Sequence, residues 1–295
     1  MSRPALLVTG GSGQVGTGIA HVNRGRFDIV APGRAEVDLA NEGAVAAYIA
    51  SRDWAAIINC GAYTAVDRAE SDEAAAFAIN AEAPATMARA AAARGIPLLH
   101  VSTDYVFDGS KEGFYTEDDP VAPLGVYGAS KEAGECAVRE SGARHIILRT
   151  AWVVSPWGNN FVKTMLRLGA EREELAIVAD QIGCPTSAQD IAETLLALAE
   201  RLISDPVSPI GTYHFVNSGG ATWHELAIHI FTRAAQAGRK TPDVRAIATS
   251  EYPTPAKRPA NSRLSIAKLF RDYEISGRSW HVAVDDILRT LFRDQ

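Results

Sequence analysis

Tyr127 and Lys131 lie four residues apart in the segment VYGASK (126–131), with only small residues between them. In a helix, side chains at this spacing lie on one face and can converge. A free tyrosine has a pKa of about 10 and is a poor base at neutral pH. A neighbouring lysine stabilises the phenolate and lowers that pKa toward the working range. The pair could therefore transfer a proton, although a surface tyrosine beside a solvated lysine would show the same spacing.

Three polar side chains stand at the end of an apolar run, LLHVST (98–103), that is typical of a buried strand: Ser102, Thr103 and Asp104. In α/β sheets the carboxyl ends of the strands carry the ligands. A strand-end threonine by itself more simply satisfies nearby backbone groups. Thr103 becomes a candidate for chemistry because Tyr127 and Lys131 follow it in the same chain.

The segment VTGGSGQVGTG (8–18) places Gly10, Gly13 and Gly16 between a strand and a helix. Glycines there allow a tight turn and let a pyrophosphate approach backbone N–H groups at a helix N-terminus. A plain strand–helix turn also uses glycine, but this position in the first strand–helix unit favours dinucleotide binding. The spacing, G-x-x-G-x-x-G, differs from the G-x-G-x-x-G of ordinary dehydrogenases.

Alternating strand and helix patterns run through the first half of the chain. The strand patterns lack polar alternation, as strands buried on both faces of a parallel sheet do. They cover residues 5–10, 28–31, 55–62, 98–103 and 145–150. Helical patterns cover 72–94, where Pro84 is expected to interrupt the helix and Gly95 to end it, and the segment from Tyr127 to about Ser141. The order predicts an α/β fold with a Rossmann-type, doubly wound parallel sheet.

Beyond Thr150 the alternation is less regular. We expect helices over 159–174, 188–203 and 222–238, strands over 175–180 and 212–217, and an irregular Pro-rich loop over 250–265. Thr222 and Glu225 form a capping-box pattern at the start of the third helix. No flexible linker interrupts the chain. The sequence therefore predicts a dinucleotide-binding part, 1–150, and a smaller C-terminal α/β substrate-binding part, 151–295, packed directly on it.

Composition narrows the classes of partner. The 295 residues carry a net charge of −6, which offers no basic field for nucleic acid or an anionic membrane. The three cysteines are far apart, so neither a disulfide framework nor a zinc site is expected, and we expect no metal ligands. The first apolar run is too short for a signal peptide or a membrane span. We therefore expect a cytoplasmic protein that binds a small molecule.

Taken in order, these motifs resemble the extended short-chain dehydrogenase/reductases, and more closely the dTDP-4-dehydrorhamnose reductase family. The matching blocks run from residue 8 to about residue 265. Besides the glycine segment they are AYTAVDRAESD, STDYVFDG, VYGASKEAGE, RTAWVVSPWGNNFVKTML, DQIGCPT, TWHELA and YPTPAKRPANSRL. Each block is modest evidence, but their number and order make coincidence a poor explanation.

The resemblance implies a catalytic set of Thr103, Tyr127 and Lys131. Tyr127 would deliver a proton to the C4 carbonyl oxygen of the substrate as hydride arrives from the nicotinamide. Lys131 would hold the nicotinamide ribose and lower the tyrosine pKa, and Thr103 would hydrogen-bond the carbonyl oxygen.

The resemblance also implies binding residues. Those for the cofactor are Gly10, Gly13, Gln14, Val15, Gly16, Asp38, Leu39, Ala62, Tyr63 and Thr64, together with Tyr127 and Lys131. Those for the substrate are Thr103, Asp104, Trp152, Val66, Asn160 and Arg258. Arg34 is added on charge: where an NAD enzyme places an acid after the second strand, this chain has a cation that can pair with a 2′-phosphate. We therefore expect NADPH to be preferred, with NADH also accepted.

The implied activity is NAD(P)H-dependent reduction of dTDP-4-dehydro-6-deoxy-L-mannose (dTDP-4-dehydrorhamnose) to dTDP-L-rhamnose. A nucleotide-sugar dehydratase or epimerase is the nearest alternative, but dehydratases of this superfamily have Asp-Glu after the threonine, where this chain has Asp104 and Tyr105. A second alternative is a non-catalytic regulatory subunit resembling that of methionine adenosyltransferase. Some family members form dimers around Mg²⁺; Gln189 stands where a carboxylate ligand would be expected, so Mg²⁺ and a homodimer both stay open.

Overall fold

Six parallel strands form the central sheet, in the order β10-β5-β4-β3-β1-β2. The structure is a computed structural model that describes residues 3–293. The strands are β1 (Ala5–Thr9), β2 (Asp28–Val30), β3 (Ala56–Asn59), β4 (Leu98–Thr103), β5 (His145–Thr150) and β10 (Gly211–His214). The chain runs from β1 to β2 at one edge, crosses back past β1 to β3, and continues to β4 and β5 on the other side. This is the doubly wound topology that the sequence predicts.

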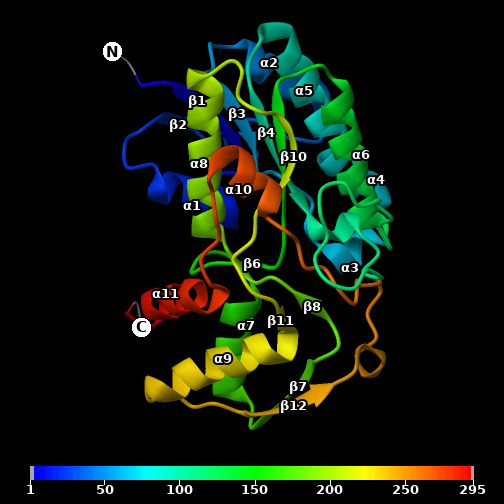
Figure 1. Ribbon diagram of the computed structural model, residues 1–295, viewed down its shortest axis with the longest axis vertical. Helices are drawn as coiled ribbons and strands as arrows, with labels where there is room; N and C mark the ends of the chain where they lie inside the picture. Colours follow the sequence, from blue (N-terminus) through cyan, green and yellow to red (C-terminus); the bar gives the residue numbers. More distant parts are fainter. Residues whose placement is uncertain (1–2, 294–295) are drawn as a thin grey trace.

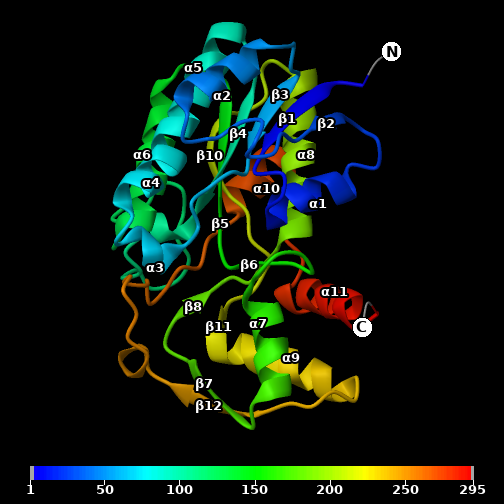
Figure 2. The same cartoon turned by 180° about the vertical axis from the view of Figure 1, so that it is seen from behind.

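Alternate side chains of each strand serve two apolar cores, one on each face of the sheet. Leu6 and Val8 of β1 pack in the first core, whereas Leu7 between them packs in the second. The first face is covered by α1 (Gln14–Val22) and α8 (Ala188–Ser204), the second by α2 (Glu42–Ala50), α5 (Ala83–Arg94) and α6 (Val126–Glu140) (Figures 1 and 2). Burial of both faces explains why the strand sequences lack polar alternation.

The five strands predicted in the first half are confirmed as β1 to β5. The segment predicted as a strand over 212–217 also forms one, β10, which joins the same sheet beside β5. The sixth strand and helix α8 therefore come from the chain after residue 150. The division into parts at 1–150 and 151–295 stays a prediction.

The helix predicted over 72–94 is interrupted, as Pro84 suggested. It consists of α4 (Glu73–Phe77), a π-helical turn η1 (Ala78–Glu82) and α5, which has Pro84 in its first turn. Proline has no N–H to donate to the preceding turn, so the wider turn falls where that hydrogen bond is missing. Gly95 ends α5 in the left-handed conformation, as predicted.

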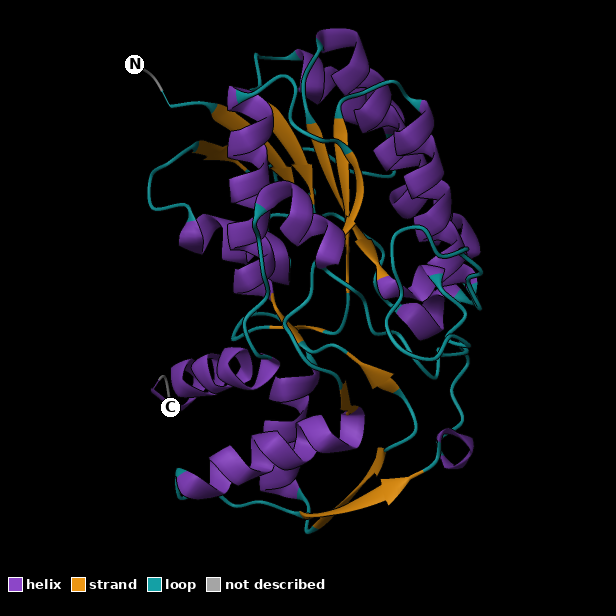
Figure 3. Ribbon diagram, in the orientation of Figure 1, coloured by secondary structure: helices purple, strands orange, loops and turns teal. Residues whose placement is uncertain are grey.

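A second layer lies below the carboxyl ends of the strands (Figures 1 and 3). Helices α7 (Phe161–Glu171), α9 (Trp223–Gln236) and α11 (Trp280–Arg293) share one apolar core. The expected capping box opens α9: Thr222 accepts from the Glu225 N–H, and the Glu225 carboxylate accepts from the Thr222 N–H. The short pairs are β7 (Glu174–Val178) with β12 (Asp243–Ile247), β6 (Val153–Val154) with β9 (Thr186–Ser187), and β8 (Ile182–Gly183) with β11 (Ala221–Thr222).

The remaining elements are short. They are α3 (Val66–Ala69), α10 (Ala267–Tyr273), and the 3₁₀ turns η2 (Asp104–Val106) and η3 (Thr249–Glu251). The sequence did not predict α10, α11 or β12. Among residues 3–293, no helix has both the length and the apolar character needed to cross a membrane.

Candidate active site

A cavity of about 820 Å³ opens at the carboxyl ends of β1, β3, β4 and β5 and extends toward the second layer. Most residues predicted for binding or catalysis line it. They are Gly10, Gly13, Gln14, Val15, Arg34, Asp38, Leu39, Ala62, Thr64, Val66, Thr103, Asp104, Tyr127, Lys131 and Trp152. The fold thus brings residues that are far apart in the sequence into one site; Gly13 and Lys131, for example, are separated by 118 positions.

The glycine turn at one end of the cavity has no room for side chains. Gly10 has φ +69°, and a Cβ there would lie 2.6 Å from the Gly61 nitrogen. A Cβ on Gly16 would lie 2.4 Å from the Gly10 carbonyl oxygen, so Gly16 serves the packing of α1 and does not line the cavity. Gly13 is the N-cap of α1 and provides no side-chain cap, so the first N–H groups of the helix face the cavity. Such a cradle fits the pyrophosphate of a dinucleotide.

Small residues between Tyr127 and Lys131 let α6 approach η2 and η1. A Cβ on Gly128 would lie 2.2 Å from the Tyr105 carbonyl oxygen. Ser130 is fully buried and accepts a hydrogen bond from Asn80 Nδ2 at 3.0 Å. The Glu70 carboxylate accepts from the Val126 N–H and fixes the start of the helix. This packing positions the side chains of Tyr127 and Lys131 against the end of β4.

Burial sets the protonation of the pair. It raises the pKa of Tyr127 to about 12, against the opposing hydrogen bond from Thr103, and lowers the pKa of Lys131 to about 8. The expected lowering of the tyrosine pKa by Lys131 is not found, because desolvation dominates. Tyr127 is thus a neutral phenol at neutral pH, which is the form that can donate a proton. Lys131 Nζ donates to the Val101 carbonyl oxygen at 2.7 Å.

Thr103 and Asp104 are buried at the tip of β4. Thr103 Oγ1 donates to Asp104 Oδ1 at 3.0 Å and accepts from the Tyr105 N–H at 3.2 Å. Burial raises the pKa of Asp104 to about 6. Tyr105 packs its ring edge-on against Tyr127, with 5.5 Å between centroids. The tip of β4 therefore offers a hydroxyl and a carboxyl group beside the phenol.

An aromatic wall closes the cavity opposite the sheet. Trp152 and Trp223 stack with 3.4 Å between ring centroids, and Phe161 packs on Trp223 at 4.7 Å. Trp152 has φ +46°, and a Cβ on Gly183 would lie 2.3 Å from its indole. A non-glycine residue held at positive φ is strained, and such strain occurs often at functional sites. The sequence did not single out Trp223, although it lies in the TWHELA block.

Some predicted residues lie outside the cavity. The Tyr63 backbone exchanges hydrogen bonds with Asn80, and its hydroxyl donates to Asp72. Asn160 caps α7 and donates to Gln14 Oε1 at 3.0 Å, an oxygen that also accepts from Ser155 at 2.7 Å. These contacts join the glycine turn to the second layer.

Arg258 does not line the cavity either, and forms a bidentate ion pair with Asp67 at 3.0 and 2.8 Å. Arg34 keeps 82% of its side chain exposed at the cavity edge and lies 3.8 Å from Asp38. Arg34 is therefore free to turn toward a ligand phosphate, whereas Arg258 would first have to leave Asp67.

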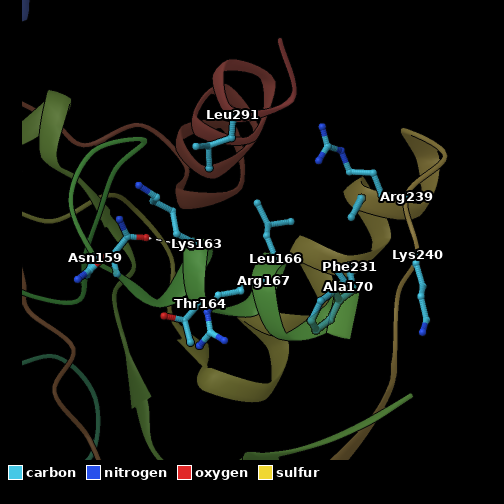
Figure 4. Close-up of a pocket in the computed structure, with 12 residues that line it drawn as sticks. Asn159, Lys163, Thr164, Leu166, Arg167, Ala170, Phe231, Arg239, Lys240 and Leu291 are labelled. Atoms are coloured by element: carbon cyan, nitrogen blue, oxygen red, sulfur yellow. Dashed lines mark hydrogen bonds between the residues drawn. The ribbon is translucent and has the colours of Figure 1, made fainter. Parts of the chain in front are cut away.

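A second cavity of about 600 Å³ lies between α7, α9 and α11 (Figure 4). Its rim carries the cations Lys163, Arg167, Arg239 and Lys240. Arg167 pairs with Glu171, Lys240 pairs with Glu173, and Arg239 stacks over Phe292. Neighbouring carboxylates thus offset much of this charge. Within residues 3–293, no three His, Cys, Asp or Glu side chains gather closely enough to hold a metal ion.

Comparison with known proteins places the chain in a family. Residues 4–293 match the family model described as RmlD substrate binding domain. The dTDP-4-dehydrorhamnose reductase of Sinorhizobium fredii is 44% identical over 276 residues, which cover 93% of either chain. That of Aggregatibacter actinomycetemcomitans is 43% identical over 286 residues, covering 96% of this chain and 97% of the relative.

Solved structures agree with the sequence relatives. The dTDP-4-dehydrorhamnose reductase of Bacillus anthracis, crystallised in complex with NADP, superposes with a TM-score of 0.89 at 35% identity, covering 99% of this chain and 100% of that one. An orthologue from Clostridium acetobutylicum gives the same TM-score at 34% identity, covering 97% and 99%. The resemblance seen in the motifs is confirmed, and the chain belongs to the dTDP-4-dehydrorhamnose reductase family.

Proposed function

We propose that this chain reduces the C4 ketone of dTDP-4-dehydro-6-deoxy-L-mannose with NADPH and yields dTDP-L-rhamnose. Its family membership supports this substrate, and the NADP-bound relative from Bacillus anthracis supports the cofactor. The observation that carries the proposal is the meeting of the glycine turn with Thr103, Tyr127 and Lys131 in one cavity.

The cofactor has a suitable cradle in this cavity. The α1 N-terminus and the Gly10–Gly13 turn would hold the pyrophosphate, and Lys131 would hold the nicotinamide ribose. NADPH, when bound, supplies the hydride. Arg34 is the cation at the cavity edge that can pair with the adenosine 2′-phosphate.

The protein side of the reaction is a proton transfer. Thr103 would donate a hydrogen bond to the substrate carbonyl oxygen, in place of its present bond to Asp104. The neutral phenol of Tyr127 would then deliver its proton to that oxygen as C4 is reduced. The stacked indoles of Trp152 and Trp223 would pack against the apolar side of the 6-deoxy sugar.

A non-catalytic nucleotide-binding role is less well supported, because such a role does not need a hydroxyl, a phenol and an ammonium at one strand tip. NADPH consumption with and without the dTDP-4-keto sugar separates the two. Oxidation of NADPH only when the sugar nucleotide is present supports the reductase. Binding of NADPH without oxidation in both samples would favour the regulatory role.

We also propose that the protein works in a reducing compartment such as the cytoplasm. Its three cysteines, Cys60, Cys136 and Cys184, are all free thiols.

A further inference from the structure

Lys131 is a buried cation. Its side chain is 2% exposed, and its ammonium group donates to the Val101 carbonyl oxygen. Placing an unpaired ammonium group in such surroundings is costly, and burial lowers the pKa of Lys131 to about 8. The proposed role of Lys131 requires the charged form. A nearby negative charge is therefore needed to keep it protonated.

Glu135 lies one helical turn beyond Lys131 on the same face of α6, and its side chain is fully buried. Arg149 of β5 donates from Nε at 2.9 and 3.1 Å and from Nη2 at 2.6 Å, and Arg139 donates at 2.9 Å. Burial opposes ionisation of this carboxyl, yet its bonds to Arg149 lower the pKa of Glu135 to about 2. Glu135 is therefore an anion over the whole working pH range.

The other titratable groups around Lys131 supply no such charge. Burial raises the pKa of Cys60 to about 12, so this thiol stays neutral. Burial lowers the pKa values of His100 on β4, His145 on β5 and His214 on β10, so these imidazoles are also neutral at pH 7. Tyr127 is a neutral phenol.

Glu132 is another carboxylate of this cluster, and it bonds to Arg139 at 2.5 Å and lies 3.7 Å from Arg149. Arg149 and Arg139 bring positive charge to the same cluster. Burial lowers the pKa of Lys131, and the charge of Glu135, the carboxylate one helical turn away on the same helix, opposes that shift.

We propose that Glu135 is a positioning residue for the reaction: held by Arg149, it is the counter-charge that keeps Lys131 an ammonium ion directed at the cavity. Lys131 lines the cavity, whereas Glu135 and Arg149 do not. Glu135 therefore acts through the lysine and does not touch substrate or cofactor. The pairing of β4 with β5, in which Ser102 lies beside Arg149, fixes the guanidinium behind the lysine. The inference deepens the proposed function and rests on it.

The test is the pH dependence of kcat/KM for NADPH-driven reduction in the full-length enzyme. The parent rate should fall above pH about 8 as Lys131 loses its proton. In Glu135→Gln this decrease, the alkaline limb of the pH profile, should begin at a pH lower by at least about one unit. That shift corresponds to a roughly tenfold larger acid dissociation constant of Lys131. Glu135→Asp keeps the negative charge, so its alkaline limb should lie close to that of the parent. Glu140→Gln, which removes an exposed carboxylate from the same helix, is the control and should leave the limb in place.

A second readout needs no turnover. Lysine labelled with ¹³C at Cε reports the Lys131 titration by NMR, with the signal assigned from Lys131→Met. If Glu135→Gln does not fold, the double variant Glu135→Leu/Arg149→Met removes the ion pair without leaving the Arg149 guanidinium buried and unpaired, and its lysine should also titrate at lower pH.

If the parent is active and the variants show the same alkaline limb and the same Lys131 titration as the parent, the inference is overturned and the proposed function stands. An inactive parent would refute the proposed function instead. In that case the NMR titration still decides whether Glu135 holds the lysine protonated.

Discussion

Tyr127 and Lys131 carry different parts of the proposed chemistry, and single substitutions should separate them. Tyr127→Phe removes the proton donor and keeps the ring that packs against Tyr105. We expect the rate of reduction to fall by about 10²- to 10⁴-fold while the Kd for NADPH changes little. Stopped-flow reduction and fluorescence titration measure the two quantities. A Phe variant that turns over within threefold of the parent would show that Tyr127 is not the acid.

Arg34 should set the cofactor preference. Its guanidinium is exposed at the cavity edge, where it can pair with the 2′-phosphate of NADPH, whereas NADH offers it no anion there. We expect kcat/KM to favour NADPH, and Arg34→Ala to reduce the preference through the KM for NADPH by about 3- to 30-fold. Parallel kinetics with both cofactors check this. Arg68→Ala, another exposed arginine that does not line the cavity, is the control. Equal loss with NADH and NADPH would contradict the assignment.

At the scale of the elements, the π-helical turn η1 links the loop at Ala62–Thr64, which we propose binds the cofactor, to α6, which carries Tyr127 and Lys131. Asn80, at its centre, is fully buried. Its side chain accepts from the Tyr63 N–H at 2.8 Å and donates to the Tyr63 carbonyl oxygen and to Ser130 of α6. The wide turn allows this one amide to reach both neighbours. π-Helical turns occur frequently at functional sites.

Asn80→Ala should therefore affect stability and cofactor binding together. Losing these buried hydrogen bonds should cost about 1–3 kcal/mol of unfolding free energy, and the loop at Ala62–Thr64 should bind NADPH more weakly. Chemical denaturation and NADPH titration measure the two effects. Asn41→Ala, which removes only the N-cap of α2, should destabilise by a similar amount without changing the NADPH Kd. Equal NADPH affinity in both variants would contradict the role of Asn80.

The elements that the sequence predicted well are those with strong local patterns. The buried strands, the Gly95 stop and the Thr222–Glu225 capping box depend on residues close together in the chain. The strand β12 was missed because three of its five residues are exposed and they show neither a buried run nor an alternation, so the strand depends on its pairing with β7. The position of β10 in the main sheet was likewise not predictable, because local sequence does not specify a distant partner.

The same distinction applies to the site: local motifs could be predicted from the sequence, and contacts between distant segments could not. The glycine turn, Thr103, Tyr127 and Lys131 form recognisable motifs, and the structure brings them to one cavity. Pairing partners from distant segments could not be foreseen. Arg258 is held by Asp67, 191 residues away, and Asn160 by Gln14, 146 residues away. The expected effect of Lys131 on the Tyr127 pKa failed because the sequence does not reveal how deeply the phenol is buried.

At the scale of the whole molecule, the two layers meet over the cavity. Gln14 follows the glycine turn, and Ser155 and Asn160 begin the second layer, so their hydrogen bonds join the proposed cofactor cradle to the aromatic wall. The cavity thus has the sheet on one side and the stacked indoles on the other. We propose that a dinucleotide and a nucleotide sugar meet in this cavity, with their reacting carbons in contact beside the tip of β4.

The central claim is hydride transfer to C4 of the sugar, and isotope transfer tests it most directly. The parent enzyme is incubated with NADPH deuterated at C4 of the nicotinamide and with dTDP-4-dehydro-6-deoxy-L-mannose, and the product is analysed by NMR. Both C4 deuterated epimers of the cofactor are tried, so that the face of transfer does not affect the outcome. The account predicts that one of the two epimers yields dTDP-L-rhamnose with deuterium at C4 of the sugar, and that Tyr127→Phe forms this product far more slowly. Unlabelled product from both epimers, deuterium at another carbon, or no conversion with either epimer would contradict it.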